Sequence, residues 1–262
     1  MPKKVFIGVG HGGTDSGAVG YVVEKDANLQ MALACKEYLE ANNVEVKLSR
    51  YKDENDSLNE VVKECNEYKP DLALDSHNNA GKGDGFEGYY QINNNQSKIL
   101  AENIEKEIIA IGQNSRGIKT RVNSAGTADY YGFLRLVNAT AVIVEGAFVD
   151  NQADAEQIDT IEEQKEFGYA YARGILKTLG IDTTNEPIKE EGSDEPVRVY
   201  QNGRTPEPVY ADTNLSVKIG SLNPREKCDC FGIFNNRAMV RYKIDNSNNY
   251  KIGFCKWLGG VI

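Results

Sequence analysis

The first 181 residues alternate between short apolar runs and longer stretches whose apolar positions recur at helical spacing. A run of about four to eight apolar residues bounded by turn residues is typical of a strand buried on both faces. Such runs predict strands over residues 4–9, 43–48, 71–76, 86–92 and 141–145, and a short strand over 133–135. Helical spacing predicts helices over residues 25–41, 57–68 and 97–112, and one or two helices over residues 152–179.

Two local features refine this pattern. Ser57 and Glu60 have the spacing of a capping box at the start of a helix. Residues 113–131 are polar and rich in glycine, which predicts a surface loop. Strands that alternate with helices indicate an α/β fold with a mostly parallel, twisted sheet flanked by helices. Ligands of such folds bind beyond the carboxyl ends of the strands.

The pattern changes after residue 181. Residues 182–196 contain two prolines, six acidic residues and few apolar ones, which predicts an acidic linker. Residues 197–262 contain short β-rich runs separated by Asn, Gly and Pro turns, which predicts a small all-β barrel. We therefore expect a main domain over residues 1–181 and a small domain over residues 197–262.

The two predicted domains differ in the sign of their net charge. Residues 1–181 contain 28 acidic and 19 basic side chains, whereas residues 194–262 contain seven acidic and ten basic ones. An acidic main domain argues against nucleic acid as a partner, because nucleic-acid binding requires a basic surface. No apolar run approaches the length of about 20 residues that a membrane span needs.

The N-terminal residues resemble a signal peptide only in part. The start is basic, but the apolar core after it is short and is interrupted by Gly10, His11 and Asp15. We therefore expect the chain to be made in the cytoplasm without a signal peptide, so that action outside the cell would require another route of release.

Five cysteines leave at least one unpaired. Cys35 and Cys65 fall on apolar helix faces, as small core residues do. Cys228 and Cys230 are two residues apart, so on a strand they would project from the same face. Together with Cys255 they could form a zinc site, although no fourth ligand is nearby in the sequence. Buried, reduced thiols are the expectation.

The chain has two histidines, and each follows an apolar run. His11 follows the strand predicted over residues 4–9, and His77 follows the strand predicted over residues 71–76. Glu145 ends another predicted strand, and Glu24 opens the first predicted helix. Because the carboxyl ends of parallel strands share one edge of a sheet, these side chains are predicted to meet in one cleft.

Two imidazoles and one carboxylate are a suitable set of protein ligands for catalytic Zn²⁺, which keeps one position open for water. His11, Glu24 and His77 fit the ligands. Glu145 fits the carboxylate that accepts the proton of the water and passes it to the leaving amine.

His11, His77 and Glu24 also fit more ordinary roles, whereas the carboxylate of Glu145 would be costly to bury without a partner. Either histidine can be a hydrogen-bonded rim residue, and Glu24 can simply favour the helix dipole. The glycine-rich residues 10–18 could cradle a phosphate, but their spacing fits neither GxGxxG nor a P-loop. The ligand spacing is likewise no compact metal motif, so the residues alone leave both roles open.

Five stretches occur in an order that resembles a known family. They are Val9-Gly10-His11-Gly12-Gly13-Thr14-Asp15-Ser16-Gly17-Ala18, Glu24, Leu74-Asp75-Ser76-His77-Asn78-Asn79-Ala80, Gly85-Phe86-Glu87-Gly88-Tyr89-Tyr90 and Val142-Ile143-Val144-Glu145-Gly146-Ala147-Phe148-Val149-Asp150-Asn151. Over about residues 3–180 the chain resembles the zinc-dependent N-acetylmuramoyl-L-alanine amidases of bacterial autolysins and phage endolysins.

This resemblance implies a reaction and roles for particular residues. It implies that His11, Glu24 and His77 hold Zn²⁺, that Glu145 is the catalytic acid, and that the amide between N-acetylmuramic acid and L-alanine is cleaved. Bacterial peptidoglycan is then the partner. Asn79 is a weaker candidate for hydrogen bonds to substrate amides, and its alternative role is to cap a turn.

The chain departs from the family pattern at two places. The family commonly has Ser where this chain has Asp75, and Asp-Pro where it has Gly8-Val9. Neither departure affects a predicted ligand. Asp75 either points to the opposite face of the sheet or orients His77 as a hydrogen-bond acceptor.

The C-terminal residues resemble the bacterial SH3-like modules that bind cell walls. The matching features are Phe231-Gly232, Val240-Arg241-Tyr242 and the stretch from Tyr250 to Leu258.

Together with the expected absence of a signal peptide, this resemblance favours a phage or prophage endolysin that acts at the cell wall after release. The alternatives are a zinc peptidase that cuts the stem peptide or cross-bridge, and a wall-binding protein without catalysis.

Overall fold

The computed structural model describes residues 2–182, 198–201, 205–210, 218–234, 237–243 and 250–256. The chain divides into two compact units, residues 1–187 and 188–262. The linker predicted over residues 182–196 lies, apart from Asp182, outside the described residues. No helix in the described part of the chain is long and apolar enough to cross a membrane.

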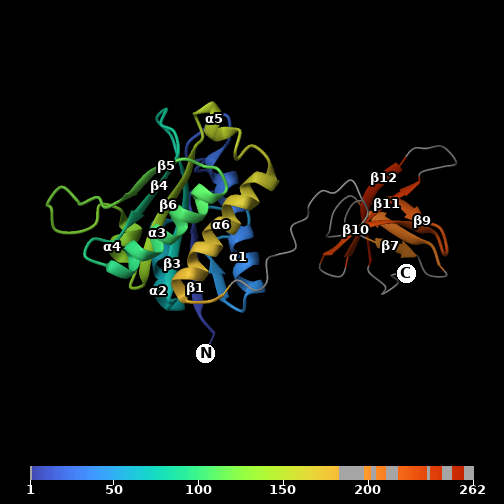
Figure 1. The fold of residues 1–262 in the computed structure, drawn as a ribbon, viewed down its shortest axis with the longest axis horizontal. Coiled ribbons are helices and arrows are strands. Elements are labelled where there is room, and N and C mark those ends of the chain that lie inside the picture. The colour runs from blue at the N-terminus through green and yellow to red at the C-terminus, as the bar shows by residue number, and fades with distance from the viewer. Residues whose placement is uncertain are drawn as a thin grey trace. The chain divides into compact units, whose positions relative to one another are not determined.

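The first unit is built on a six-stranded sheet with the strand order β2-β1-β3-β6-β4-β5. Figure 1 shows this sheet with its surrounding helices. The strands are β1 (Lys4–Val9), β2 (Glu45–Leu48), β3 (Leu72–Asn79), β4 (Phe86–Tyr90), β5 (Ser115–Lys119) and β6 (Thr140–Phe148). Every neighbouring pair is parallel except β4 and β6. The predicted α/β fold with a mostly parallel sheet is confirmed.

Helices cover both faces of this sheet. They are α1 (Glu24–Ala41), α2 (Leu58–Tyr68), α3 (Asn95–Ala110), α4 (Gly132–Leu136), α5 (Gln152–Ala155) and α6 (Ile161–Leu179). Val5 and Ile7 of β1 belong to the core that contains α1, α3 and α6, whereas Phe6 between them belongs to the core that contains α2 and α4. Because strand side chains alternate between faces, the three long helices lie on one face and the two shorter ones on the other.

Helix α2 begins at the position that the Ser57 and Glu60 pattern predicts. The Ser57 hydroxyl accepts a hydrogen bond from the Glu60 backbone N–H at 3.3 Å, and the Glu60 carboxylate accepts one from the Ser57 N–H at 3.1 Å. The predicted capping box is therefore confirmed.

One local prediction was wrong, and another was right only in part. The short strand expected over residues 133–135 is part of helix α4, which buries Phe133 and Leu134. A run of three apolar residues cannot separate a strand from a single helical turn, and packing decided the outcome. Residues 113–131 contain the edge strand β5, whose sequence Ser-Arg-Gly-Ile-Lys has a single large apolar residue and so lacks the usual alternation.

The second unit contains a six-stranded sheet in which every neighbouring pair is antiparallel, in the order β7-β10-β11-β12-β8-β9. Its strands are β7 (Arg198–Gln201), β8 (Glu207–Tyr210), β9 (Lys218–Leu222), β10 (Lys227–Phe234), β11 (Arg237–Lys243) and β12 (Tyr250–Lys256). The small core contains Cys228, Cys230 and Cys255, and all five cysteines of the chain are buried.

Candidate functional site

Three side chains converge at the carboxyl edge of the parallel strands. His11, Glu24 and His77 each offer one ligand atom, and these atoms lie within 4.8 Å of one another. Glu24 Oε1 is 3.2 Å from His11 Nε2 and 3.1 Å from His77 Nδ1. No other group of three possible metal ligands occurs among the residues that the structure describes, and Cys228, Cys230 and Cys255 therefore form no such group.

Two glycines make room for this convergence. A Cβ atom on Gly10 would lie 2.3 Å from the His77 ring, and one on Gly17 would lie 2.5 Å from Glu24 Oε2. Gly17 also has a φ of 61°, which disfavours other residues, and His11 itself has a φ of 62°. The glycine-rich loop after β1 therefore serves close packing around the two histidines.

The carboxylate of Glu24 is buried at the first turn of α1, and hydrogen bonds fix both of its oxygens. Oε2 accepts the Ala18 N–H at 2.8 Å, and Oε1 accepts the Asn78 N–H at 3.1 Å. Oε1 also lies 3.4 Å from the amide nitrogen of Asn28, which is one helical turn further along α1. A carboxylate held at this many points cannot rotate freely, so its position is set before any ligand binds.

Two buried asparagines beneath Glu24 were not singled out from the sequence. The Asn78 amide donates to Asn28 Oδ1 at 2.8 Å, and Asn78 Oδ1 accepts the Ala147 N–H at 3.1 Å. The Asn28 amide also donates to the Gly10 carbonyl at 3.1 Å. Their signal in the sequence is a polar residue at an otherwise apolar position, since Asn28 lies four residues after Glu24 on the buried face of α1.

The charges of the three residues depend on one another. Burial alone would raise the pKa of Glu24, but hydrogen bonds from His11 and His77 lower it well below its usual range. Burial alone would lower the pKa of His77, but the carboxylates of Asp75 and Glu24 raise it well above 6.5. The hydrogen bond to Glu24 raises the pKa of His11 in the same way. The site is thus an acidic pocket that attracts positive charge.

The outward nitrogen of each histidine also faces a carboxylate. His11 Nδ1 lies 2.9 Å from Asp15 Oδ2, and His77 Nε2 lies 3.5 Å from Asp75 Oδ2. Asp75 is two residues before His77 on β3, so both side chains are on the same face of the sheet. The alternative that Asp75 points to the opposite face is therefore excluded. Carboxylates placed in this way orient the imidazoles of metal sites.

Glu145 lies beside the cluster on the neighbouring strand. His77 of β3 and Glu145 of β6 are paired in register, which puts both side chains on one face of the sheet. Burial raises the pKa of Glu145 to about 7, although the charge of His77 opposes this. The structure thus brings together all four residues that the sequence singled out as ligands and base.

Asn79 ends β3, but its side chain forms no hydrogen bond with His11, Glu24 or His77. Its amide nitrogen is 3.4 Å from Glu87 Oε2, and its Oδ1 accepts the Ala80 N–H at 2.8 Å. The second contact is the turn-capping role that was the alternative to substrate binding. Glu87, which was not singled out from the sequence, lies between Asn79 and β5.

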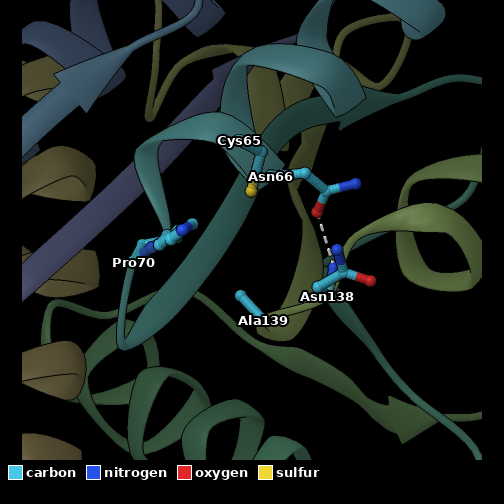
Figure 2. A pocket seen from close by; sticks show the side chains of 6 residues that line it. Cys65, Asn66, Pro70, Asn138 and Ala139 are labelled. Carbon is cyan, nitrogen blue, oxygen red and sulfur yellow. Dashed lines mark hydrogen bonds between the residues drawn. The ribbon is translucent and has the colours of Figure 1, made fainter.

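A separate hollow lies at the other end of the strands (Figure 2). It is lined by residues at the end of α2 and by the residues just before β3 and β6: Cys65, Asn66, Lys69, Pro70, Asn138 and Ala139. Asn66 accepts the Asn138 N–H at 2.7 Å across it. Because these residues precede the strands whose far ends carry His77 and Glu145, the hollow is not part of the cluster.

Comparison with known proteins assigns the chain to a family. The chain matches the family described as N-acetylmuramoyl-L-alanine amidase over residues 5–177. It is 32% identical over 182 residues to the N-acetylmuramoyl-L-alanine amidase CwlM of Bacillus licheniformis, covering 68% of this chain and 69% of that protein. It is 30% identical over 206 residues to the endolysin of Bacillus phage SPP1, covering 75% of this chain and 73% of the endolysin.

A solved structure leads to the same class. The catalytic domain of CwlV, an N-acetylmuramoyl-L-alanine amidase from Bacillus (Paenibacillus) polymyxa var. colistinus, has a TM-score of 0.62 and 30% identity, covering 69% of this chain and 99% of that chain. The chain therefore belongs to the N-acetylmuramoyl-L-alanine amidase family. It is a peptidoglycan hydrolase that cleaves the amide between N-acetylmuramic acid and L-alanine, which confirms the amidase prediction and disfavours a peptidase or a non-catalytic protein.

Proposed function

We propose that the amidase is zinc-dependent, with His11, Glu24 and His77 as the metal ligands and Glu145 as the general base. The observation that carries the proposal is the meeting of the three ligand atoms within 4.8 Å, with Glu145 in register beside His77. The ligand types support zinc as the metal, because two imidazoles and a carboxylate are a common ligand set for catalytic zinc. Membership of the amidase family supports the same choice.

The residues present fit such an ion in three respects. The pocket is acidic, its ligand atoms already face one another, and the outward nitrogens of both histidines face carboxylates. Nearby carboxylates raise the pKa values of His11 and His77, so protons on the imidazoles balance this negative charge in the metal-free chain. A cation bound between the ligands would balance the same charge in place of the protons. Zinc bound in this pocket would supply Lewis-acid activation of water and polarisation of the scissile carbonyl.

The chain itself performs the proton transfers. The carboxylate of Glu145 accepts a proton from the attacking water while the new carbon–oxygen bond forms at the lactyl carbonyl. Protonated Glu145 then gives that proton to the nitrogen of L-alanine as the carbon–nitrogen bond breaks. A pKa near 7 suits both roles, because the group can accept and release a proton near neutral pH.

Product analysis tests the proposed reaction directly. Digestion of purified peptidoglycan is expected to release peptides with a free L-alanine amine and to leave the number of reducing sugar ends unchanged. Mass spectrometry of the fragments measures the first, and a reducing-end assay measures the second. New reducing ends, or peptides opened within the stem or cross-bridge, would contradict the proposal.

Asp75 is expected to strengthen metal binding through His77. Replacing it with asparagine removes the charge that faces His77 Nε2, and loss of such a partner typically costs about 10–100-fold in metal affinity. Competition for Zn²⁺ with a chromophoric chelator measures the change. Asp71→Asn is the matched control, since Asp71 pairs with Lys3 just before β3, at the other end of the strands. Equal affinities of the Asp75 and Asp71 variants would show that Asp75 does not act on the metal site.

We further propose that residues 197–262 form an SH3-like wall-binding domain, joined to the amidase domain of residues 1–181 by an acidic linker over residues 182–196. The antiparallel sheet and its small apolar core support this assignment. Tethering to the wall would raise the local concentration of the amidase there. The relationship to a phage endolysin supports a role in lysis after release from the producing cell.

A shortened chain tests the role of the second unit. A chain that ends at residue 181 is expected to sediment with purified walls at least about ten-fold more weakly than the full chain, because the tethered contact is lost. Hydrolysis of small soluble muropeptides should persist, since it needs the first unit alone. Unchanged sedimentation would contradict a wall-binding role for the second unit.

A further inference from the structure

A row of charged side chains continues from the metal cluster across the sheet. Glu145 of β6 is in register with His77 of β3 on one side and with Glu87 of β4 on the other. Residues directly opposite each other in a sheet project from the same face. His77, Glu145 and Glu87 therefore stand side by side, about 4.8 Å apart from strand to strand.

Glu87 is buried and holds two cations of the next strand, β5. Its Oε1 lies 2.6 Å from Arg116 Nε and 2.7 Å from Lys119 Nζ. Its Oε2 accepts the Tyr89 hydroxyl at 2.9 Å. Burial would raise the pKa of Glu87, but the bonds from Lys119, Arg116 and Tyr89 lower it, so the group stays ionised.

A β-bulge places the two cations together. Residues 116 and 119 are three apart and would project from opposite faces of a regular strand. The register between β4 and β5 shifts between the pairs Phe86↔Ser115 and Gly88↔Ile118, and Gly117 within the shift has a φ of 90°. Bulges often redirect side chains next to active sites, and this one turns Arg116 and Lys119 to the same carboxylate.

The arrangement has more positive charge than Glu87 neutralises. Arg116 and Lys119 are 45% and 36% exposed, whereas Glu87 is 7% exposed, so the cations reach solvent and the anion does not. Arg116 bonds Glu87 through Nε alone, and its two terminal nitrogens have no hydrogen-bond partner among the described residues. Its guanidinium carbon lies 5.5 Å from the centre of the Phe148 ring. A guanidinium held in this way has one edge ready to take a carboxylate.

We propose that Arg116 and Lys119 bind a carboxylate of the stem peptide, within about three residues of the scissile amide. This inference rests on the amidase function proposed above. The lactyl carboxyl group is consumed in the amide that is cleaved, so the carboxylates of this part of the substrate lie on the peptide side. The two strand spacings from β6 to β5 amount to about 10 Å, the length of about three extended residues. The peptide would therefore run from Glu145 toward β5, with the glycan on the opposite side.

A pair of synthetic substrates tests this subsite. Both are N-acetylmuramoyl peptides that begin with L-alanine, and the following residue carries either a free α-carboxylate or its carboxamide. The measured quantity is the ratio of kcat/KM for the carboxylate to kcat/KM for the carboxamide. The native chain is expected to favour the carboxylate about ten-fold or more, and Arg116→Gln or Lys119→Gln should bring the ratio close to one.

A second cluster on the far face of the sheet provides a matched control. Glu107 of α3 is held by Arg173 and Lys177 of α6, so Arg173→Gln removes the same charge from a similar ion-pair cluster. Its substrate ratio should equal that of the native chain. Arg116→Lys keeps the charge without the fork and should restore part of the preference. Zinc content and thermal unfolding of each variant show whether it is folded.

The outcomes separate this inference from the proposed function. A native ratio near one, or a ratio that Arg116→Gln and Lys119→Gln leave unchanged, would overturn the carboxylate subsite while leaving the amidase reaction intact. Failure of the native chain to release L-alanine amines from either substrate would overturn the reaction itself. A ratio that falls in the β5 variants and not in Arg173→Gln would support the subsite.

Discussion

Exchanging Glu145 for glutamine is expected to lower kcat/KM for amide hydrolysis by about 10²–10⁴-fold, the usual contribution of a general acid or base. Glutamine has nearly the same size but cannot accept and return a proton near neutral pH. The effect should fall mainly on kcat, since the loss is confined to the proton transfers. Release of L-alanine amines from purified walls, measured at substrate concentrations around KM, gives both constants.

Two comparisons make this result specific to proton transfer. Zinc content and sedimentation with walls should stay at the native level, because Glu145 is not among the proposed ligands. Glu64→Gln is the matched control, since Glu64 forms a surface ion pair with Lys47 at 2.9 Å and should leave activity unchanged. Lysis at the native rate by Glu145→Gln would remove Glu145 from the mechanism.

Removing the metal is expected to abolish hydrolysis, and adding Zn²⁺ to the metal-free chain should restore it. The physical reason is that the remaining groups would have to activate water and the amide carbonyl without a Lewis acid. Mg²⁺ should not restore activity, because imidazole ligands suit zinc and magnesium prefers oxygen ligands. Residual activity after complete removal of metal, checked by elemental analysis, would contradict zinc dependence.

Glu24→Gln should reproduce the loss of metal in the intact chain. Glu24 Oε1 faces both histidines at 3.2 and 3.1 Å, so an amide in its place removes a charged ligand from the centre of the cluster. Zinc affinity is expected to fall by at least about two orders of magnitude, because a neutral amide is a much weaker ligand for zinc than the deprotonated carboxylate that it replaces. Ala18 and Asn78 donate to different oxygens of Glu24, so the single amide oxygen of glutamine can keep one of these two hydrogen bonds, and with the side-chain size unchanged the fold should be retained. Unfolding by heat, compared with that of the metal-free native chain, checks this.

The metal affinity should also depend on pH in a defined direction. In the metal-free chain the pKa values of His11 and His77 are raised, so both imidazoles hold protons at higher pH than usual. A protonated imidazole cannot bind zinc, so the ion must displace these protons. The apparent zinc affinity is therefore expected to decrease as the pH falls through the raised pKa values and to level off above them. Calorimetric titrations in buffers of different ionisation enthalpy would count the protons released.

The sequence by itself determined the class of fold and the candidate residues of the site. Apolar runs and helical spacing are local properties, and they were sufficient to place strands β1, β3 and β6, helix α1 and the capping box of α2. His11, His77 and Glu145 could be chosen because parallel strands present their carboxyl ends along one edge. The resemblance to the amidase family then identified the bond that is cleaved, and the comparisons confirmed it.

The tertiary structure alone decided how the remaining polar residues are used. Asn28 and Asn78 are far apart in the chain, and only packing of α1 against β3 joins them beneath Glu24. Strand β5 has too few apolar residues to be recognised, and it exists because it pairs with β4. The meeting of Arg116 and Lys119 on Glu87 depends on a bulge and on strand register. Register and bulges are set by contacts between distant segments, so the periodicity of a single segment does not contain them.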